Sequence, residues 1–429
     1  MTAVAAARIT SAAQAQETAA RLAAQFAVDA ARRDRDRELP HRELDQLSAS
    51  GLLAVTVPAE FGGADLAPAQ VAEVFRLLAA ADPNIAQIPH SHFVYLNLLR
   101  LAGTRAQRDR YFGRVLAGAR IANAQSERSS ATVAEIGTTL RPSEGEFRSP
   151  SDGEFRSPSD GGFRIDGTKF YCTGSLFADL LAVLTRLDDP DGRSGLDPGE
   201  YIAFLPADTA GVTIVDDWNG IGQRTTGSGT VTFDAVRVTA DQLIPRAAAV
   251  RAPTGYGAFA QLLHVAIDVG IARGALDAAA EFVRTKSRPW FEAGVDRASE
   301  DPLVIQRIGE LAVTVAAAEA TFEVAGRTVD HVVAQTNSGD LDTETAGALA
   351  AEASIAVATA KITSDRAAND VSAALFEVSG TRSAAAELDL DRFWRNARTH
   401  TLHDPVRWKY QHIGRAVLNG TAPPLHGVI

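Results

Sequence analysis

A block of short β-rich runs, enclosed by two long helical stretches, limits the possible folds of this chain more than any other sequence feature. Between residues 119 and 250, apolar and β-branched runs alternate with turn signals such as Asp166-Gly167 and Asp191-Gly192. The strands predicted from these runs span residues 163–166, 180–187, 201–205, 212–215 and 230–238. We therefore expect a small all-β domain in the middle of the chain.

The stretches on both sides are Ala-rich and carry apolar residues at helical spacing. Before the β-rich block, the pattern predicts helices at 10–37, 41–50, 68–81, 84–101 and 105–117, and an extended segment at 52–63. After it, the predicted helices are 258–287, 302–336, 343–376 and 391–400. Long amphipathic helices of this kind are typical of an antiparallel bundle. We predict an α+β multidomain fold, with an N-terminal helical domain (1–118), a central β-barrel or sandwich (119–250) and a C-terminal four-helix bundle (251–429).

Length and composition exclude several classes of protein. A chain of 429 residues is long enough for two or three domains, and its net charge of −11 argues against a nucleic-acid partner. The single cysteine, Cys172, excludes an intrachain disulfide and fits a reducing compartment. No apolar run reaches the length of about 18 residues that a membrane span needs, and the N-terminus shows no signal-peptide core. We expect a cytoplasmic protein with no membrane partner.

One segment is duplicated without change: residues 146–153 are repeated as residues 154–161. The repeat is rich in turn formers and poor in core formers, so we expect a mobile surface loop and assign it no function.

The densest group of titratable residues lies near the C-terminal end, where His403 is followed directly by Asp404 and preceded by His400. The helix at 391–400 should end there, because Pro405 disfavours a helical conformation in the residue before it. Both imidazoles then lie at a helix C-terminus and can exchange a proton near neutral pH. Two other interpretations stay open. One is a helix cap beside a core histidine, and the other is a zinc or iron site, for which the sequence shows no second ligand cluster.

Three motifs, together with the helical, β, helical order, resemble the acyl-CoA dehydrogenase superfamily over nearly the whole chain. The segment 57–63, Val-Pro-Ala-Glu-Phe-Gly-Gly, is similar to that family's Pro-Glu-Xaa-Tyr-Gly-Gly turn. The segment 169–174, Lys-Phe-Tyr-Cys-Thr-Gly, is similar to its Lys-Xaa-Trp-Ile-Thr-Asn motif. The segment 220–238 resembles its Gly-Xaa-Arg to Val-Arg-Val strand pair.

The resemblance implies a flavin held by loops of the β domain. Thr173 takes the place of the threonine that hydrogen-bonds flavin N5, and a hydroxyl suits that atom because it can donate or accept. Asn123 and Ser126 fall where the family has its Val-Thr-Glu flavin contact.

The resemblance also implies phosphate contacts from the C-terminal helices. Arg288, with Arg284 as the alternative, falls in the region that reaches the flavin phosphates. Ser379, Gly380 and Arg382 occupy the place of a loop that offers backbone amides to the flavin phosphate of a neighbouring subunit. That arrangement implies an oligomer, and we expect a homotetramer.

One departure from the family pattern points to a different reaction. Acyl-CoA dehydrogenases have a Glu-Gly-Thr, whose glutamate removes the substrate α-proton, where this chain has Asp-Pro-Val at 404–406. The segment 394–405, with His403 followed by Asp404, resembles instead the oxygen-using branch of the superfamily, namely the dibenzothiophene monooxygenases and the sulfur-acquisition oxidoreductases. The tail at 408–429 resembles the sulfur-acquisition group.

That branch uses reduced FMN, supplied by a separate reductase, and O2 to form a flavin C4a-hydroperoxide that oxygenates a small substrate. By resemblance we expect a small organosulfur substrate, with His403 as the donor beside the peroxide and His92 as a second candidate. His92 and Tyr95 are three residues apart and so on one helix face, from which they can line a pocket together with Trp218. We expect no metal.

Two alternatives remain. An FAD-dependent dehydrogenase that desaturates a thioester, with Asp404 or His403 as its base, would be yellow when purified and would bleach with acyl-CoA. A catalytically silent helical scaffold would bind no flavin and would tolerate the changes His403→Ala and Thr173→Ala.

Overall fold

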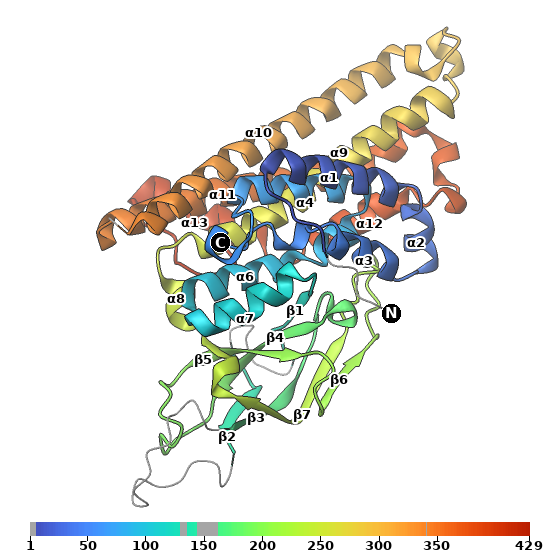
Figure 1. The fold of residues 1–429 in the computed structure, drawn as a ribbon. Helices are drawn as coiled ribbons and strands as arrows, with labels where there is room; N and C mark the ends of the chain where they lie inside the picture. The colour runs from blue at the N-terminus through green and yellow to red at the C-terminus, as the bar shows by residue number, and fades with distance from the viewer. Residues whose placement is uncertain (1–5, 129–134, 144–161, 340) are drawn as a thin grey trace, which may run out of the picture.

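The computed structural model describes residues 6–128, 135–143, 162–339 and 341–429. Helices occupy both ends of the chain and a sheet occupies the middle, in the order that the sequence predicts (Figure 1). The duplicated segment at 146–161 lies outside the described residues, so the loop expected there stays a prediction.

The chain before the sheet forms the helices α1 (Ala12–Ala27), α2 (Ala30–Asp36), α3 (His41–Ala49), α4 (Pro68–Ala81), α5 (Pro83–Gln87), α6 (His90–Ala102) and α7 (Arg105–Leu116). Side chains cap several starts: Ser11 accepts a hydrogen bond from the backbone N–H of Gln14, and Thr104 and Gln107 form a capping box. The predicted helix 84–101 is in fact two helices, because Pro89 has no N–H with which to continue the first one. The predicted helix 10–37 divides in the same way, with Asp29 at the start of its second half.

The sequence predicted an extended segment at 52–63, and this prediction was wrong. The segment forms two 3-10 helices, η1 (Leu52–Ala54) and η2 (Ala59–Phe61). Leu52 and Leu53 are buried in the core that the helices share with one face of the sheet. The backbone there forms its hydrogen bonds locally, for example from Ala54 N–H to the Gly51 carbonyl, because buried amides need a partner.

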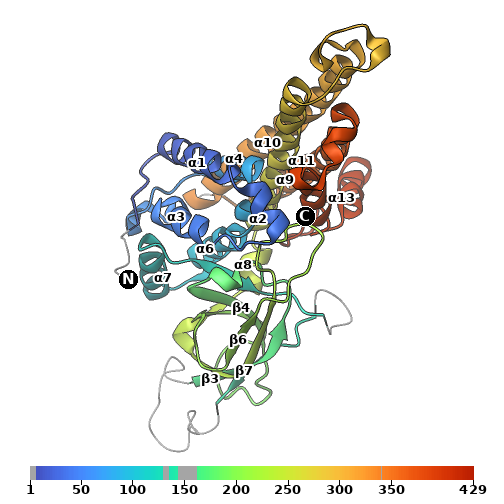
Figure 2. The same cartoon turned by 90° about the vertical axis from the view of Figure 1, so that its right-hand side faces the viewer.

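The central strands are β1 (Ile121–Ala124), β2 (Thr139–Pro142), β3 (Gly162–Lys169), β4 (Leu180–Leu187), β5 (Glu200–Pro206), β6 (Val212–Val215), β7 (Thr230–Thr239) and β8 (Leu243–Pro245). They form one sheet in the order β6-β7-β3-β2-β4-β5-β8, with β1 parallel to β4. The sheet curls as it passes below the helices (Figure 2). The predicted runs are the cores of β3 to β7, whereas β1, β2 and β8 have only three or four residues each and were missed.

The strand β4 is apolar on both faces, and this explains how the sheet is attached to the helices. Leu181 and Val183 point into the core of the β domain, whereas Leu180 and Leu184 belong to the core shared with the helices. Because successive side chains of a strand point to opposite faces, one strand contributes to both cores.

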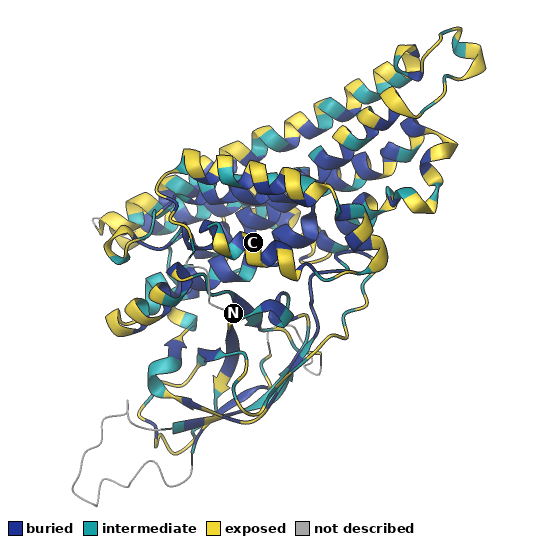
Figure 3. Cartoon of the chain, turned by 45° about the vertical axis from the view of Figure 1, so that its right-hand side comes forward, coloured by how far each residue is buried: buried dark blue, intermediate teal, exposed yellow. Residues whose placement is uncertain are grey.

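After the sheet come the helices α8 (Ala247–Arg251), α9 (Tyr256–Thr285), α10 (Pro302–Ser338), α11 (Thr343–Ser379), α12 (Asp391–His400) and α13 (Val406–Asn419). The long helices α9, α10 and α11 pack against one another, and α12 and α13 pack on α11. The bounds predicted for α12 are confirmed, whereas α13 was not predicted. Buried residues gather where the helices meet, and exposed ones follow their outer faces (Figure 3).

Helix α9 is the centre of the molecule. It contacts α4, α10 and α11, and the backbones of α9 and α4 approach so closely that a Cβ on Gly274 would lie 2.4 Å from the Ala80 carbonyl oxygen. With a mean hydropathy of 1.3, α9 is long and apolar enough to cross a membrane by composition, but 94% of that window is buried inside the protein. The helix is therefore placed as a core helix.

Candidate active site

His403 lies in the turn between α12 and α13, and its orientation is set by the next residue. Its Nδ1–H donates to Oδ1 of Asp404 at 3.0 Å. The His403 side chain is 46% exposed, whereas that of Asp404 is 3% exposed. Because this bond occupies Nδ1, Nε2 is the nitrogen that can meet a reacting oxygen.

Asp404 is committed to a second partner, Lys409 on α13. The ammonium of Lys409 lies 2.7 Å from Oδ2 of Asp404, and it also donates to Oε1 of Gln261 at 3.0 Å. Burial alone would raise the pKa of Asp404, but the bond from His403 and the charge of Lys409 outweigh it and hold that pKa well below its usual value. Asp404 is therefore a permanently ionised group that orients His403, and it has no geometry for removing a proton from a substrate.

A second carboxylate and histidine pair lies deeper, and the sequence analysis did not predict it. Oδ1 of Asp268 on α9 accepts from His400 Nδ1–H at 2.5 Å, and its Oδ2 accepts from Lys361 on α11 at 2.5 Å. Nε2 of His400 in turn accepts from His264 Nδ1–H at 3.1 Å. All four side chains are buried. Burial lowers the pKa of His264 and of His400 despite the nearby Asp268, so both rings are neutral at physiological pH.

The ring of His264 lies between two other imidazoles. His90, the first residue of α6, stacks on it with ring centroids 3.8 Å apart and an angle of 28°. His403 lies 4.1 Å from it at 38°. Nε2–H of His90 donates to the Ala260 carbonyl at 2.9 Å, and burial lowers the pKa of His90 to about 3. Three segments of the chain therefore meet in one histidine cluster, made of His90, His264, His400 and His403.

The β domain approaches this cluster through Thr173. The Thr173 hydroxyl is hydrogen-bonded to Ser228 at 2.8 Å, and Ser228 to Thr226 at 2.7 Å. The next residue, Gly174, packs against Ile88, two residues before His90. The threonine predicted to contact the flavin therefore lies on the side of the β domain that faces the histidines.

A cavity of about 280 Å³ opens beside Thr173, close to the lower end of the range for small-molecule pockets. It is lined by Arg128, Tyr171, Asp217, Trp218, Asn219, Ser228, Gly229 and Thr230. The rings of Tyr171 and Trp218 meet edge to face at 6.1 Å, and the guanidinium of Arg128 lies 5.0 Å from the centre of the Tyr171 ring. These flat walls suit a planar aromatic ligand.

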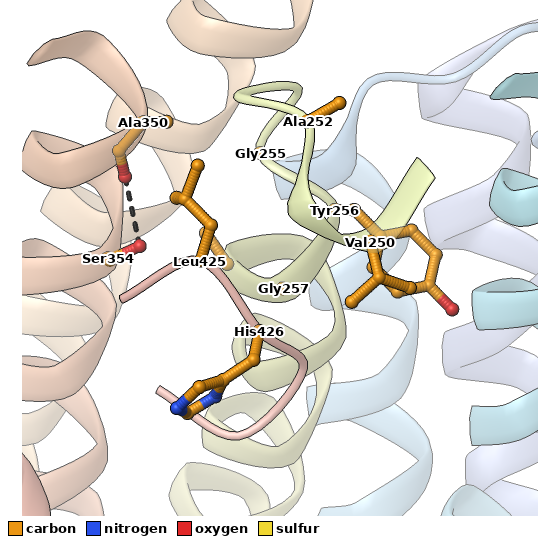
Figure 4. Close-up of a pocket in the computed structure, with 10 residues that line it drawn as sticks. Val250, Ala252, Gly255, Tyr256, Gly257, Ala350, Ser354, Leu425 and His426 are labelled. Carbon is orange, nitrogen blue, oxygen red and sulfur yellow. Dashed lines mark hydrogen bonds between the residues drawn. The ribbon is translucent and has the colours of Figure 1, made fainter. Parts of the chain in front are cut away.

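A smaller cavity lies elsewhere, between the start of α9, α11 and the C-terminal tail (Figure 4). Its volume of about 10 Å³ admits one water molecule. It is therefore no substrate site.

Asn123 and Ser126 lie on β1 and just after it, where a flavin contact was predicted. Oδ1 of Asn123 is buried without a hydrogen-bond partner among the described residues, which is the state expected of an atom that bonds a ligand. Ser126 is exposed and forms a β-bridge with Phe170. The neighbouring Glu127 is clamped to Lys169 at 2.6 Å, so this short segment is fixed in place.

The placement of His92 favours a structural part in the fold over the donor role that the sequence suggested. Its Nε2–H donates to the Leu53 carbonyl at 2.8 Å, and its Nδ1 accepts from Ile121 N–H at 3.1 Å. Burial lowers its pKa to about 4. Tyr95 is buried as well, and donates to Oε1 of Gln125 at 2.9 Å. Neither His92 nor Tyr95 is among the described residues that line the 280 Å³ cavity.

The predicted phosphate-binding residues come together at the C-terminal ends of α9 and α11. Arg382 donates to the Lys286 carbonyl at 3.0 Å, and Ser287 donates to that of Ser379 at 2.9 Å. Gly380 has a φ of 72°, and Arg288 is exposed. Arg284, the alternative, is paired with Glu281. This group begins 20 residues after His264 along α9, which corresponds to roughly 30 Å of helix.

The loop that carries Trp218 is fixed to α12 by main-chain contacts. A Cβ on Gly222 would lie 1.9 Å from the carbonyl oxygen of Arg395. The backbone N–H of Gln223 donates to Oδ1 of Asn396 at 2.6 Å. One wall of the cavity and the helix that leads to His403 are therefore one rigid unit.

In the described part of the chain, no group of three or more His, Cys, Asp and Glu side chains is arranged to hold a metal ion. The residues fit a flavin better. Aromatic walls, the Thr173 hydroxyl and the free carboxamide oxygen of Asn123 suit a planar ring with hydrogen-bonding atoms on its edge. Helices, a curled sheet and more helices, with such a site in β-domain loops of which one packs on α12, define a flavoprotein of the acyl-CoA dehydrogenase type.

Comparison with known families identifies the chain more closely. Residues 11–119 match the model of the acyl-CoA dehydrogenase N-terminal domain, and residues 262–408 match that of the acyl-CoA dehydrogenase C-terminal domain. The chain belongs to the acyl-CoA dehydrogenase family, and the resemblance predicted from its motifs is confirmed.

Within the family the chain is similar to enzymes that use oxygen. It is 34% identical over 410 residues to dibenzothiophene monooxygenase of Rhodococcus qingshengii, and the matched region covers 94% of this chain and 92% of that protein. It is 31% identical over 404 residues to the probable FMNH2-dependent monooxygenase SfnC of Pseudomonas putida, with 94% of each chain covered. Its fold matches the crystal structure of FMN-bound TdsC from Paenibacillus sp. A11-2 with a TM-score of 0.84 and 32% identity, over 97% of this chain and 100% of that one.

Proposed function

We propose that the protein is a monooxygenase that uses reduced FMN, supplied by a separate reductase, and O2 to oxygenate a small organosulfur compound for sulfur acquisition. The names of its relatives support each part, since one acts on dibenzothiophene, one depends on FMNH2 and one holds FMN. Bound reduced FMN supplies the two electrons that reduce one atom of O2 to water while the other atom enters the substrate.

The observation that carries the proposal is the exchange of roles at residues 403 and 404. The carboxylate at the position of the dehydrogenase base is buried and bound to Lys409. The side chain that reaches the surface of the site is instead the imidazole of His403, held by Asp404 through Nδ1. With Nδ1–H on Asp404, the ring accepts a hydrogen bond at Nε2 when neutral, and in its imidazolium form it donates Nε2–H to a developing oxygen anion, which is the help that oxygen transfer needs.

Other residues bind and orient the reactants. We assign the edge of the flavin ring to Thr173, Asn123 and Ser126, and the wall of the substrate pocket to Trp218. The partly buried indole of Trp218 is itself fixed, because its Nε1–H donates to the Gln223 carbonyl at 2.7 Å. The contact of Gly174 with Ile88 places the neighbouring Thr173 on the side of the β domain that meets the helices.

We propose a homotetramer in the cytoplasm, built from the three domains 1–118, 119–250 and 251–429. The candidate phosphate contacts Arg288, Ser379, Gly380 and Arg382 lie just beyond the end of α9 and at and after the end of α11, about 30 Å along α9 from His264, so we assign them to the flavin of a neighbouring subunit. Apolar side chains exposed on α10 and α13 support such assembly: Leu303, Ile305, Val313, Trp408, Val417 and Leu418.

The alternative, an FAD-dependent desaturase, is disfavoured by the burial of Asp404. A base must reach the substrate, and this carboxylate is enclosed by its own partners. FAD, the cofactor that belongs to this alternative, is therefore also less favoured than FMN.

The test supplies the protein with FMN, NADH, a flavin reductase and ¹⁸O2, and screens sulfides, sulfones and sulfinates by mass spectrometry. We expect a product that carries ¹⁸O and needs both the protein and reduced FMN, and His403→Ala is the matched control that should not form it. Bleaching of a bound flavin by an acyl-CoA, with no uptake of ¹⁸O, would favour the desaturase and refute the proposal.

A further inference from the structure

We propose that His264 on α9 is a positioning residue whose ring is the platform that holds His403 in its reacting orientation. This inference rests on the proposed function for the role of His403, but the platform itself is a property of the protein without flavin.

The need for a platform follows from how little else restrains His403. Its side chain is 46% exposed, and a single hydrogen bond, to Asp404, holds one edge of the ring. A ring held at one atom can swing about that bond. A contact against the ring face removes this freedom, and the described structure provides it through His264, with ring centroids 4.1 Å apart and planes at 38°.

The platform is held on every side. His90 stacks on it at 3.8 Å, with its own ring centroid 6.5 Å from that of His403, and is itself bonded to the Ala260 carbonyl. Its edge donates to His400, which is bonded to Asp268, which is bonded to Lys361. This series of side-chain contacts therefore runs from α6 and α11 through α9 to the turn after α12, and His403 is its one member that reaches solvent.

Stability alone is a poor reason to keep such a chain. Burying the Asp268 carboxylate and the Lys361 ammonium removes two charges from water, and well-packed apolar residues often serve the fold as well or better. This series of hydrogen bonds instead fixes the tautomers of the two rings. The Asp268 carboxylate determines which nitrogen of His400 carries the hydrogen, and His400 in turn determines which nitrogen of His264 does. The bond to His400 thereby sets the tautomer of His264, while the stack with His90 holds the plane of its ring.

The charged and titratable groups around His264 are His90 from α6, Asp268 from α9, Lys361 from α11, and His400, His403 and Asp404 from α12 and its turn. Burial and the neighbouring histidines keep the pKa of His264 well below its usual value. The ring of His264 is therefore neutral at physiological pH.

The experiment compares three variants, first as flavin-free protein. His264→Phe keeps a flat ring but loses the bond to His400, His264→Asn keeps a hydrogen-bond donor but loses the ring, and His90→Leu is the matched control that changes the far side of the stack. Circular dichroism and gel filtration establish that each is folded and assembled. Crystal structures then report the orientation of His403.

We expect one His403 orientation, with Nδ1 on Asp404, in the wild type, in His264→Phe and in His90→Leu. In His264→Asn we expect a second orientation in the electron density. A single unchanged orientation in His264→Asn, or equal loss of order in His90→Leu, would overturn the platform. If His264→Asn does not fold, a disordered His403 in His264→Phe overturns it and an ordered one supports it.

The second readout is the fate of oxygen in the loaded protein. Loss of the platform should raise the share of consumed O2 released as H2O2 by about two- to tenfold in His264→Asn, the population change that loss of one aromatic contact produces, and leave the Phe variant near wild type. If no organosulfur compound is oxygenated by the wild type, the proposed function fails while the crystallographic result still decides the platform. If the wild type is active and His264→Asn couples O2 to product equally well, the platform fails alone.

Discussion

Replacing Asp404 by Asn isolates the ion pair that orients the candidate donor. The change leaves the ammonium of Lys409, which is 1% exposed, without its counter-charge. Removing one member of a buried pair costs about 3 to 5 kcal/mol. Because Gln261 and the Val428 carbonyl still accept from Lys409, we expect the lower end, a loss of about 3 kcal/mol in the free energy of unfolding.

Urea unfolding followed by far-ultraviolet circular dichroism measures this loss, since the midpoint falls in proportion to stability. The double variant Asp404→Asn/Lys409→Met is the matched control. It removes both charges, so it should recover most of the loss and lie within about 1 kcal/mol of wild type. A double variant as unstable as the single one would show that the pair is held by something other than its charges.

The pH dependence gives an independent check. The folded pKa of Asp404 lies below its unfolded value, so the stability it contributes is fully present above about pH 4 and is lost as pH falls toward the folded pKa. The difference between wild type and Asp404→Asn should therefore be constant near neutrality and shrink in acid. Equal stabilities at neutral pH, or a difference that grows in acid, would refute the reasoning.

The remaining predictions concern three other positions. His403→Ala should lower product formation per bound flavin by about 10²-fold or more and leave the fold intact, because the side chain is nearly half exposed; a rate near wild type would remove His403 from the reaction. Burial raises the pKa of Asp365 to about 6, so stability falls as the pH rises from the unfolded pKa of about 4 to about 6, and the full cost is present above that. Asp365→Asn should raise the urea midpoint at about pH 8 and have little effect at about pH 4, and the reverse order would contradict this. Lys169→Met strands the Glu127 carboxylate beside the candidate flavin contacts, so it should destabilise the β domain by about 3 kcal/mol and weaken FMN binding in a fluorescence titration; an unchanged FMN dissociation constant would separate the pair from the site.

The sequence predicted the parts of the fold that repeat a simple period. The strands β4 and β6 and the helices α4 and α12 have the predicted bounds because each has an uninterrupted pattern and a clear end signal. The prediction for the segment 52–63 was wrong because its apolar run is as compatible with a buried turn as with a strand. Packing against the surrounding helices decides between the two conformations. The short strands β1 and β2 have too few residues to show any period.

The residues of the candidate site likewise fall into two groups, those that could be predicted from local motifs and those that could not. His403, Asp404 and Thr173 stand in recognisable local motifs, so their importance could be predicted. His264 and Asp268 are hidden in the apolar core helix α9, and Lys361, the cation paired with Asp268, is 93 residues from it in the sequence. Their spacing of four on α9 was the available signal, since it places an imidazole and a carboxylate on one buried face. Sequence alone does not show which distant cation completes such a pair.

The contact between Gly222 and the carbonyl of Arg395 limits how this protein can be redesigned for bulkier sulfur compounds. Any side chain at position 222 would collide with the main chain of Arg395. It would displace α12 and the turn that follows it, and so misplace His403, before the cavity gained any volume. Mutant libraries aimed at a wider substrate range should therefore keep this glycine and vary Trp218, a side chain of the cavity wall, where a smaller residue adds volume.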